Sequence, residues 1–172
     1  MAESSSPSPI YSKNTLEFLA VAKSYCQVLE DPEQLDKDKL LEILLRLLPL
    51  LYLKGSLLPQ VDPIDEENLE TFASETQYGL LAGCLAALFG QDDAYLEVYH
   101  PDIALADGAV AASVSERLAD LWQEMFNFVE VYRQGFEDSM YDAIYSCRER
   151  FAQEWGPGLL HVLRALHAIK YD

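Results

Sequence analysis

One short motif places an acidic side chain at metal-ligand spacing from a histidine. Glu97-x-x-His100 has the spacing of one ligand pair of a di-iron helical bundle. Such a site needs a second Glu-x-x-His pair and two further glutamates, and neither His161 nor His167 has a glutamate three residues before it. Pro101 also opposes a helix there. We therefore expect His100 to be a loop histidine.

A second motif, Asp107-Gly108, invites comparison with a calcium loop. In an EF-hand the glycine is position 6 and a glutamate is position 12, whereas position 12 here is Val114. A looser cation site is the alternative to a solvated acidic surface, and its carboxylates would be Asp92, Asp93, Glu97, Asp102 and Asp107. Because runs of charge are usually solvated, we predict no metal and no cofactor.

The three cysteines give no sign of nucleophilic catalysis. Cys84 and Cys147 fall on apolar helix faces, where thiols are usually inert packing residues. The count is odd and no CxxC pair occurs, which is typical of reduced thiols in a cytoplasmic protein. The chain contains no GxSxG, HExxH or Gly-rich phosphate loop. An enzyme is therefore the less favoured expectation.

Polar side chains on otherwise apolar helix faces are the remaining site candidates. Together with aromatic residues near the long acidic loop they define a candidate pocket or partner patch: Tyr95, Glu97, Glu116, Asp120, Trp155, Arg164 and His167. The alternative, which we favour, is a structural network in which Arg164 neutralises a carboxylate and His167 is hydrogen-bonded inside the core.

The stretch Leu40 to Leu53 is the element around which these residues must be arranged. Eleven of its fourteen residues are apolar and nine are leucine, so no face is left for water. It is shorter than the ~20 apolar residues of a spanning helix, which predicts a central core helix rather than a membrane helix. Asp36 or Asp38 is its expected N-cap, and Pro49 is expected to kink it or end it early.

The remaining pattern predicts an all-α fold. Residues 1–10, rich in Ser and Pro, are expected to be a disordered leader without signal-peptide character, and 11–172 a single domain of five to seven helices. Helix starts are expected at Asn14, near 65–70, and at the capping boxes of Ser74 and Ser113, and a break or kink near Pro157. Residues 91–112 show no regular pattern, and no strand is expected.

Charge is the clearest functional lead. The net charge is −17, and the 62 residues between Lys54 and Arg117 hold twelve carboxylates and no Lys or Arg. Such a chain repels nucleic acid and anionic lipid surfaces, so we expect no direct binding to either.

Three segments resemble the uncharacterised bacterial DUF5063 family. They are Asp93-Ala94-Tyr95-Leu96-Glu97, Ser115 to Gln123, and Phe151-x-x-x-Trp155-Gly156 with the Leu159 to His167 stretch that follows. The similarity extends over most of the chain after the leader. It implies an all-helical domain from Bacteroidetes-like bacteria, and it implies no activity and no catalytic residues.

Two functions follow as hypotheses. The leading one is an intracellular interaction module whose acidic surface, built from residues 62–107 with Asp92, Asp93, Asp102 and Asp107, binds a basic protein or peptide. The alternative is a small-ligand-binding or enzymatic bundle whose site is Glu97, Glu116, Asp120, Arg164 and His167. The acidity could also serve solubility alone. The sequence does not determine the oligomeric state.

Overall fold

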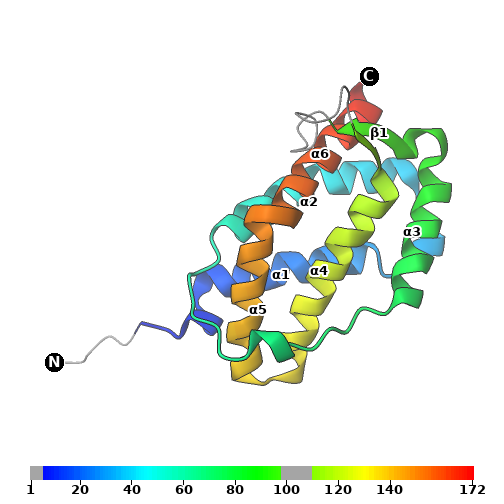
Figure 1. The fold of residues 1–172 in the computed structure, drawn as a ribbon. Coiled ribbons are helices and arrows are strands. Elements are labelled where there is room, and N and C mark those ends of the chain that lie inside the picture. The colour runs from blue at the N-terminus through cyan, green and yellow to red at the C-terminus, as the bar shows by residue number, and fades with distance from the viewer. Residues whose placement is uncertain (1–5, 98–109) are drawn as a thin grey trace.

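The structure, a computed structural model, describes residues 6–97 and 110–172, and within these ranges the chain is a helical bundle (Figure 1). The predicted all-α class is confirmed. The helices are α1 (Lys13–Val28), α2 (Lys37–Ser56), α3 (Glu75–Phe89), α4 (Val114–Gln134), α5 (Glu137–Arg150) and α6 (Gly156–Tyr171). Two strands of four residues, β1 (Ala94–Glu97) and β2 (Val110–Ser113), pair antiparallel.

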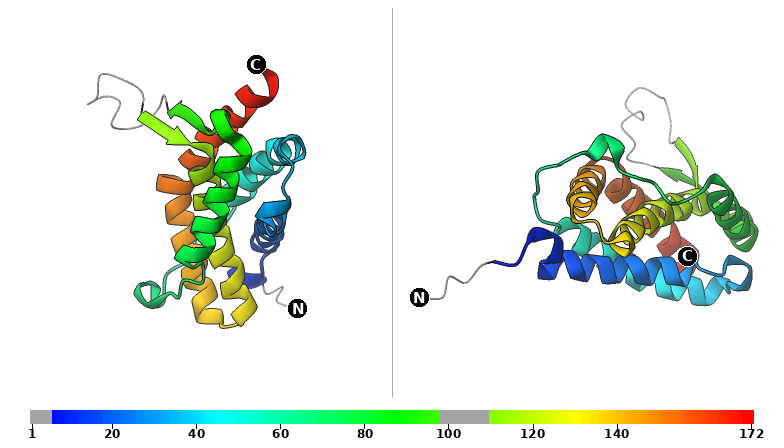
Figure 2. Two further views of the ribbon diagram at one scale, coloured as in Figure 1. Left: turned by 90° about the vertical axis from the view of Figure 1, so that its right-hand side faces the viewer. Right: turned by 90° about the horizontal axis from the view of Figure 1, so that it is seen from below.

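Helix α4 occupies the middle of the bundle. It packs against α1, α3, α5 and α6, whereas α2 packs mainly against α1 and α6. The right-hand view of Figure 2 shows α1 and α2 along the lower side of the molecule, with α4 and α5 above them. The core between these layers contains fully buried side chains such as Phe18, Leu44 and Met125.

Helix α2 contributes leucines to the core but also has a face in solvent. Leu44 and Leu51 are completely buried, as expected, while Leu50 and Leu53 are 40% and 51% exposed. The expectation that no face of this helix meets water is therefore wrong. Pro49 lies on the outer side, and the helix continues beyond it to Ser56. Within residues 6–97 and 110–172, no helix combines the length and apolar character needed to cross a bilayer.

Short polar side chains start most of the helices. Ser74 forms the predicted capping box with Gln77, and the Ser113 hydroxyl accepts a hydrogen bond from the Glu116 amide. Asp36 is the N-cap of α2. Helix α1 begins two residues earlier than expected, because Ser12 rather than Asn14 accepts a backbone hydrogen bond, from Thr15.

The described chain before α1 is packed against the bundle. Pro9–Tyr11 form a 3-10 turn, and the side chain of Ile10 is 1% exposed. The Tyr132 hydroxyl donates a hydrogen bond to the carbonyl of Ile10 at 2.7 Å. The predicted leader boundary at residue 10 therefore falls inside packed structure. Residues 1–5 lie outside the described residues.

The segment between α2 and α3 crosses the bundle without forming a helix, and two polar side chains hold its backbone. Asp142 on α5 accepts hydrogen bonds from the amides of Ile64 and Asp65 at 2.6 and 3.0 Å. Asn127 on α4 accepts from Phe72 and Ala73 at 2.7 and 2.9 Å. The helix expected near 65–70 is a single 3-10 turn.

Helices α5 and α6 are joined by one π-helical turn, Phe151–Trp155, with no loop between them. The Trp155 Nε1–H donates to the Cys147 carbonyl at 2.9 Å. Pro157 lies in the first turn of α6, where a missing amide is tolerated. The break expected near Pro157 is therefore a change of helical pitch.

The strands are the feature that the sequence analysis missed. Ala94 pairs with Ser113 and Glu97 with Val110, so the hairpin leads directly into the N-terminus of α4. In β1 Glu97 is buried and Leu96 is 64% exposed, the reverse of the usual preference of these residue types. The pairing places the Glu97 carboxylate against the helices.

Candidate functional site

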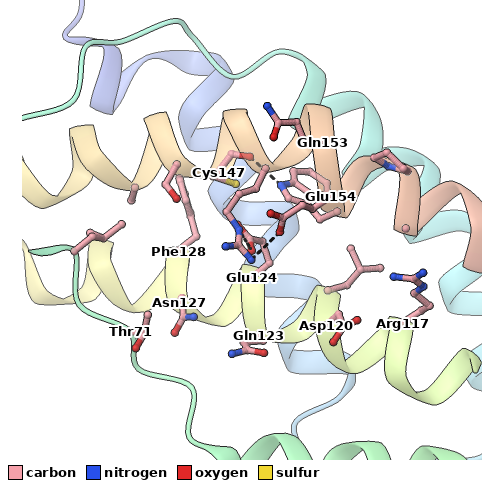
Figure 3. A pocket seen from close by; sticks show the side chains of 18 of the residues that line it. Thr71, Arg117, Asp120, Gln123, Glu124, Asn127, Phe128, Cys147, Gln153 and Glu154 are labelled. Carbon is pink, nitrogen blue, oxygen red and sulfur yellow. Dashed lines mark hydrogen bonds and ion pairs between the residues drawn. The ribbon is translucent and has the colours of Figure 1, made fainter. Parts of the chain in front are cut away.

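A pocket of about 770 Å³ lies between α4 and the continuous α5–α6 helix (Figure 3). We call it the α4 pocket. On α4 its wall extends from Arg117 to Val131, about 21 Å at 1.5 Å per residue. The crossing segment contributes Leu69 to Thr71, and the end of β1 contributes Glu97.

The floor of the α4 pocket is apolar. It is formed by core side chains from both walls: Leu121, Phe128, Val131, Ala143, Cys147 and Trp155. The ring of Trp155 is fixed by its hydrogen bond to Cys147 and by edge contact with Phe151, at a centroid distance of 4.7 Å. Burial raises the pKa of the Cys147 thiol well above its usual range, so this sulfur stays protonated.

An ion cluster bridges the two walls midway along the pocket. The Arg150 Nε donates to Glu124 at 2.8 Å, and its Nη2 lies 3.2 Å from the Glu154 carboxylate. Figure 3 shows the Glu124 and Glu154 side chains directed toward one another across the gap. Burial raises the pKa of Glu124, and the nearby Arg150 charge opposes this shift without cancelling it.

A second cluster, the Glu97 cluster, lies at the α6 end of the pocket and comprises Tyr95, Glu97, Arg117 and His161. One Glu97 carboxylate oxygen, Oε1, accepts hydrogen bonds from Arg117 Nε at 2.8 Å and from the Tyr95 hydroxyl at 3.1 Å, and Arg117 Nη2 lies 2.6 Å from it. Burial by itself raises the pKa of Glu97, but the hydrogen bonds and charge of Arg117 outweigh it, so the pKa is lowered.

The second oxygen of Glu97 faces a histidine. Its Oε2 lies 3.3 Å from Nδ1 of His161, and neither atom has a hydrogen-bond partner among the residues that the structure describes. The Glu97 side chain is 0% exposed and the His161 side chain 17%. A fully buried carboxylate is rare and needs compensation, which Arg117 supplies.

Four of the predicted site residues meet at this pocket or beside it. Glu97, Asp120 and Trp155 line it, and Tyr95 binds Glu97 from the same strand. The Asp120 carboxylate is exposed and accepts a hydrogen bond from the Tyr78 hydroxyl at 2.7 Å. Residues of β1, α4 and the turn at Trp155 therefore lie together at this pocket.

The other three predicted residues are not part of the pocket. Glu116, Arg164 and His167 are exposed, and none of them lines it. The expectation that Arg164 and His167 form a buried network is wrong. The inner face of α6 carries Leu159, Val162 and Leu166, so both polar residues project to the outside of the helix.

Four residues of the pocket were not predicted as site residues from the sequence: Arg117, Glu124, Arg150 and His161. A usable signal was present on α4, where positions 117, 121, 124 and 128 recur at helical spacing and alternate between polar and apolar residues. His161 shares a face of α6 with the small residue Gly158, one turn earlier, and both line the pocket. Neither pattern predicts that the Glu97 carboxylate, which comes from β1, contacts both Arg117 and His161.

The predicted acidic face is partly satisfied within the fold. Lys37 reaches Asp92 at 2.6 Å, and the Asp93 carboxylate accepts from the Ser115 amide and hydroxyl at 2.7 and 2.8 Å. Asp102 and Asp107 lie outside the described residues. Asp92 and Asp93 were expected to be available to a partner protein, but both have contacts within the chain.

Metal ligation has no support in the part of the chain that the structure describes. Among residues 6–97 and 110–172, no group of three or more His, Cys, Asp or Glu side chains is arranged to hold an ion. His100, which was weighed as a ligand with Glu97, lies outside these residues. Cys26, Cys84 and Cys147 are free thiols.

Comparisons with known proteins agree with the resemblance in sequence. The chain matches a crystal structure of protein BF1032 from Bacteroides fragilis, a target of the Northeast Structural Genomics Consortium, with a TM-score of 0.85 and 35% identity. The match covers 96% of this chain and 97% of that one. No functionally curated protein matches. The sequence model of the DUF5063 family, a domain of unknown function, matches residues 9–172, and the chain therefore belongs to this family.

Proposed function

We propose that this chain is a binding module whose α4 pocket holds a basic peptide segment of a partner protein. The observation that carries the proposal is the composition of the pocket. Five carboxylates, from Glu70, Glu97, Asp120, Glu124 and Glu154, line it, against two arginines. The proposal places the module in a bacterial cytoplasm, where its three free cysteines would remain reduced.

The unpaired negative charge lies at the rim. Arg117 neutralises Glu97, and Arg150 is shared between Glu124 and Glu154. Glu70 and Asp120 are exposed, and neither forms an ion pair with a described residue. Rim carboxylates of this kind attract lysine or arginine side chains and favour basic partners over acidic ones.

The shape of the pocket suits an extended chain. A wall of about 21 Å along α4 matches about six residues of extended peptide at 3.3 Å per residue. The floor offers apolar contact through Leu121, Phe128 and Trp155, and the walls offer side-chain amides at Gln123 and Gln153. Apolar contact would supply affinity, and the rim carboxylates would select for positively charged side chains of the peptide.

Fluorescence anisotropy with labelled six-residue peptides tests the proposal. One peptide alternates leucine with lysine, and its control replaces lysine with glutamine. We expect the lysine peptide to bind more tightly and its Kd to rise with ionic strength. The double variant Glu70→Gln/Glu154→Gln should weaken binding by about tenfold.

The matched control is Glu67→Gln/Glu149→Gln. It removes the same charge from two exposed positions that do not line the pocket. We expect its Kd to equal that of the wild type. Equal weakening by both double variants would mean that net charge alone attracts the peptide, and the proposal would be wrong. Absence of binding by the lysine peptide would also contradict it.

A small organic ligand is the second candidate. The pocket volume lies within the ~300–1,000 Å³ typical of small-molecule sites, and the buried Glu97 cluster supplies convergent polar groups. Calorimetry with free arginine and with the lysine peptide separates the two functions. Tighter binding of the amino acid would favour the small-ligand function.

A further inference from the structure

The contact between Glu97 and His161 favours one position for the hydrogen of the imidazole. Oε2 and Nδ1 are both buried and lie 3.3 Å apart, and neither forms a hydrogen bond with the other or with another described residue. A carboxylate only accepts hydrogen bonds, so the contact is attractive only if Nδ1 is protonated. In the neutral ring Nε2 is then an acceptor.

The free acceptor belongs to the pocket. His161 lines the α4 pocket and retains 17% exposure although its Nδ1 is buried, so the exposed part of the ring is the part that includes Nε2. The carboxylate thus acts as an orienting group for the imidazole. Glu97 is itself held by Arg117 and Tyr95, which makes this orientation rigid.

Arg117 supplies a donor beside this acceptor. Its Nε donates to Glu97 and its Nη2 lies 2.6 Å from the same oxygen, whereas Nη1 does not contact this carboxylate. Nη1 lies next to Gly158, where a Cβ atom would be 3.8 Å away, so position 158 of α6 places no side chain against it. Figure 3 shows Arg117 reaching from α4 into the gap toward α6.

The donor and the acceptor at this end of the pocket together favour an uncharged ligand group. Glu97 and Arg117 neutralise one another. An ammonium group offers no acceptor to Arg117, and a carboxylate offers no donor to the lone pair of Nε2. An amide fits both partners, because its carbonyl accepts from Arg117 while its N–H donates to His161.

We propose that Arg117 and His161, oriented by Glu97, form a subsite for an uncharged amide at the α6 end of the α4 pocket. A main-chain peptide group is the amide that the function proposed above would bring. The subsite rests on that function only for the source of the amide, because the donor and acceptor are properties of the chain itself.

The first test is the tautomer of His161. Two-bond ¹H–¹⁵N correlation spectra distinguish a ring protonated at Nδ1 from one protonated at Nε2. We expect the Nδ1–H form in the folded wild-type protein at a pH where the ring is neutral. An Nε2–H ring would overturn the proposal, because it would present a donor to the pocket.

The second test uses three small probes of nearly equal size: propionamide, propionate and propylammonium. We expect propionamide to give saturable shifts of the His161 ring nitrogens and to bind more tightly than either ion. The variant His161→Asn keeps an N–H donor near Glu97 and removes Nε2, and it should raise the propionamide Kd by about tenfold. His167→Asn, an exposed histidine on the same helix, should leave it unchanged.

Several outcomes would overturn the subsite: tighter binding of propionate, tighter binding of propylammonium, no saturable shift with any probe, or unaltered propionamide binding by His161→Asn. If that variant fails to fold, the tautomer and the ranking of the three probes in the wild type still decide the matter. Binding of the lysine peptide depends on Glu70 and Glu154, so its failure is distinguishable from failure of the subsite.

Discussion

The indole ring of Trp155 packs directly onto Gly55 of α2. A Cβ atom at Gly55 would overlap carbon atoms of the ring, so no larger residue fits without displacement. The ring cannot easily move, because its Nε1–H donates to the Cys147 carbonyl and it packs against the rings of Phe18 and Phe151. This contact joins α2 to the π-helical turn that forms the floor of the α4 pocket.

Gly55→Ala should therefore destabilise the fold. Overpacking a well-filled contact costs about 1–3 kcal/mol, which exceeds the helix-propensity gain of alanine over glycine. Gly83→Ala is the matched control, since its Cβ would meet nothing within 4 Å and the residue is exposed in α3. Urea denaturation should show Gly83→Ala more stable than the wild type by about 0.5–1 kcal/mol. If urea denaturation showed Gly55→Ala to be more stable than the wild type, the contact between Gly55 and Trp155 would be loosely packed.

Glu97→Gln should cost stability that depends on pH. The lowered pKa of Glu97 means that its carboxylate stabilises the folded state above the unfolded value of 4.5, and that this contribution disappears as pH falls through the folded pKa. At neutral pH we expect a loss of about 3 kcal/mol, the low end for a broken buried pair, because Arg117 is partly exposed. Denaturation midpoints across pH 7 to 3 should converge with the wild type at the acid end. A pH-independent difference would contradict this role for the charge.

Glu124→Gln should show the opposite dependence. The pKa of Glu124 is raised by burial, so its contribution to stability is present below 4.5 and is lost as pH rises through the folded pKa. Relative to the wild type, Glu124→Gln should gain stability on going from pH 4 to pH 8. The same urea experiments measure this change, and a relative loss of stability with rising pH would mean that Arg150 outweighs burial.

The three thiols should differ in reactivity. Burial raises the pKa of Cys26 to about 12 and that of Cys147 well above its usual range, so neither forms much thiolate near pH 8. Cys84 is half-buried on α3. Mass spectrometry after iodoacetamide treatment of the folded protein should find Cys84 modified first. Early modification of Cys147 would show that the pocket floor opens.

The sequence predicted those parts of the fold that local rules determine. Ser74 and Ser113 start their helices because a hydroxyl caps the first free amides, and Gly135 ends α4 with a positive φ of 83°. The leucines of α2 indicated burial, but not which of them face solvent. That choice depends on α1 and α6, which cover only one side of α2.

The candidate site was only half predicted because it depends on long-range contacts. Glu97 was identified, yet its partners Arg117 and His161 are 20 and 64 positions away along the chain. The pairing of β1 with β2 turns the Glu97 carboxylate toward them, and the alanine-rich sequence of β2 gave no strand signal. Arg164 was expected inside because the sequence does not show which face of α6 packs against the bundle; the structure has Val162 on the inner face and Arg164 exposed.

The most direct measurement is amide chemical-shift mapping of the ¹⁵N-labelled protein during titration with the leucine–lysine peptide. Binding in the α4 pocket should shift residues of α4 between Arg117 and Val131 together with those between Ala143 and His161. Amides on the outer face of α2 should not move. Shifts confined to the segment of residues 62–70 or spread evenly over the acidic surface would contradict a peptide site between α4 and α6.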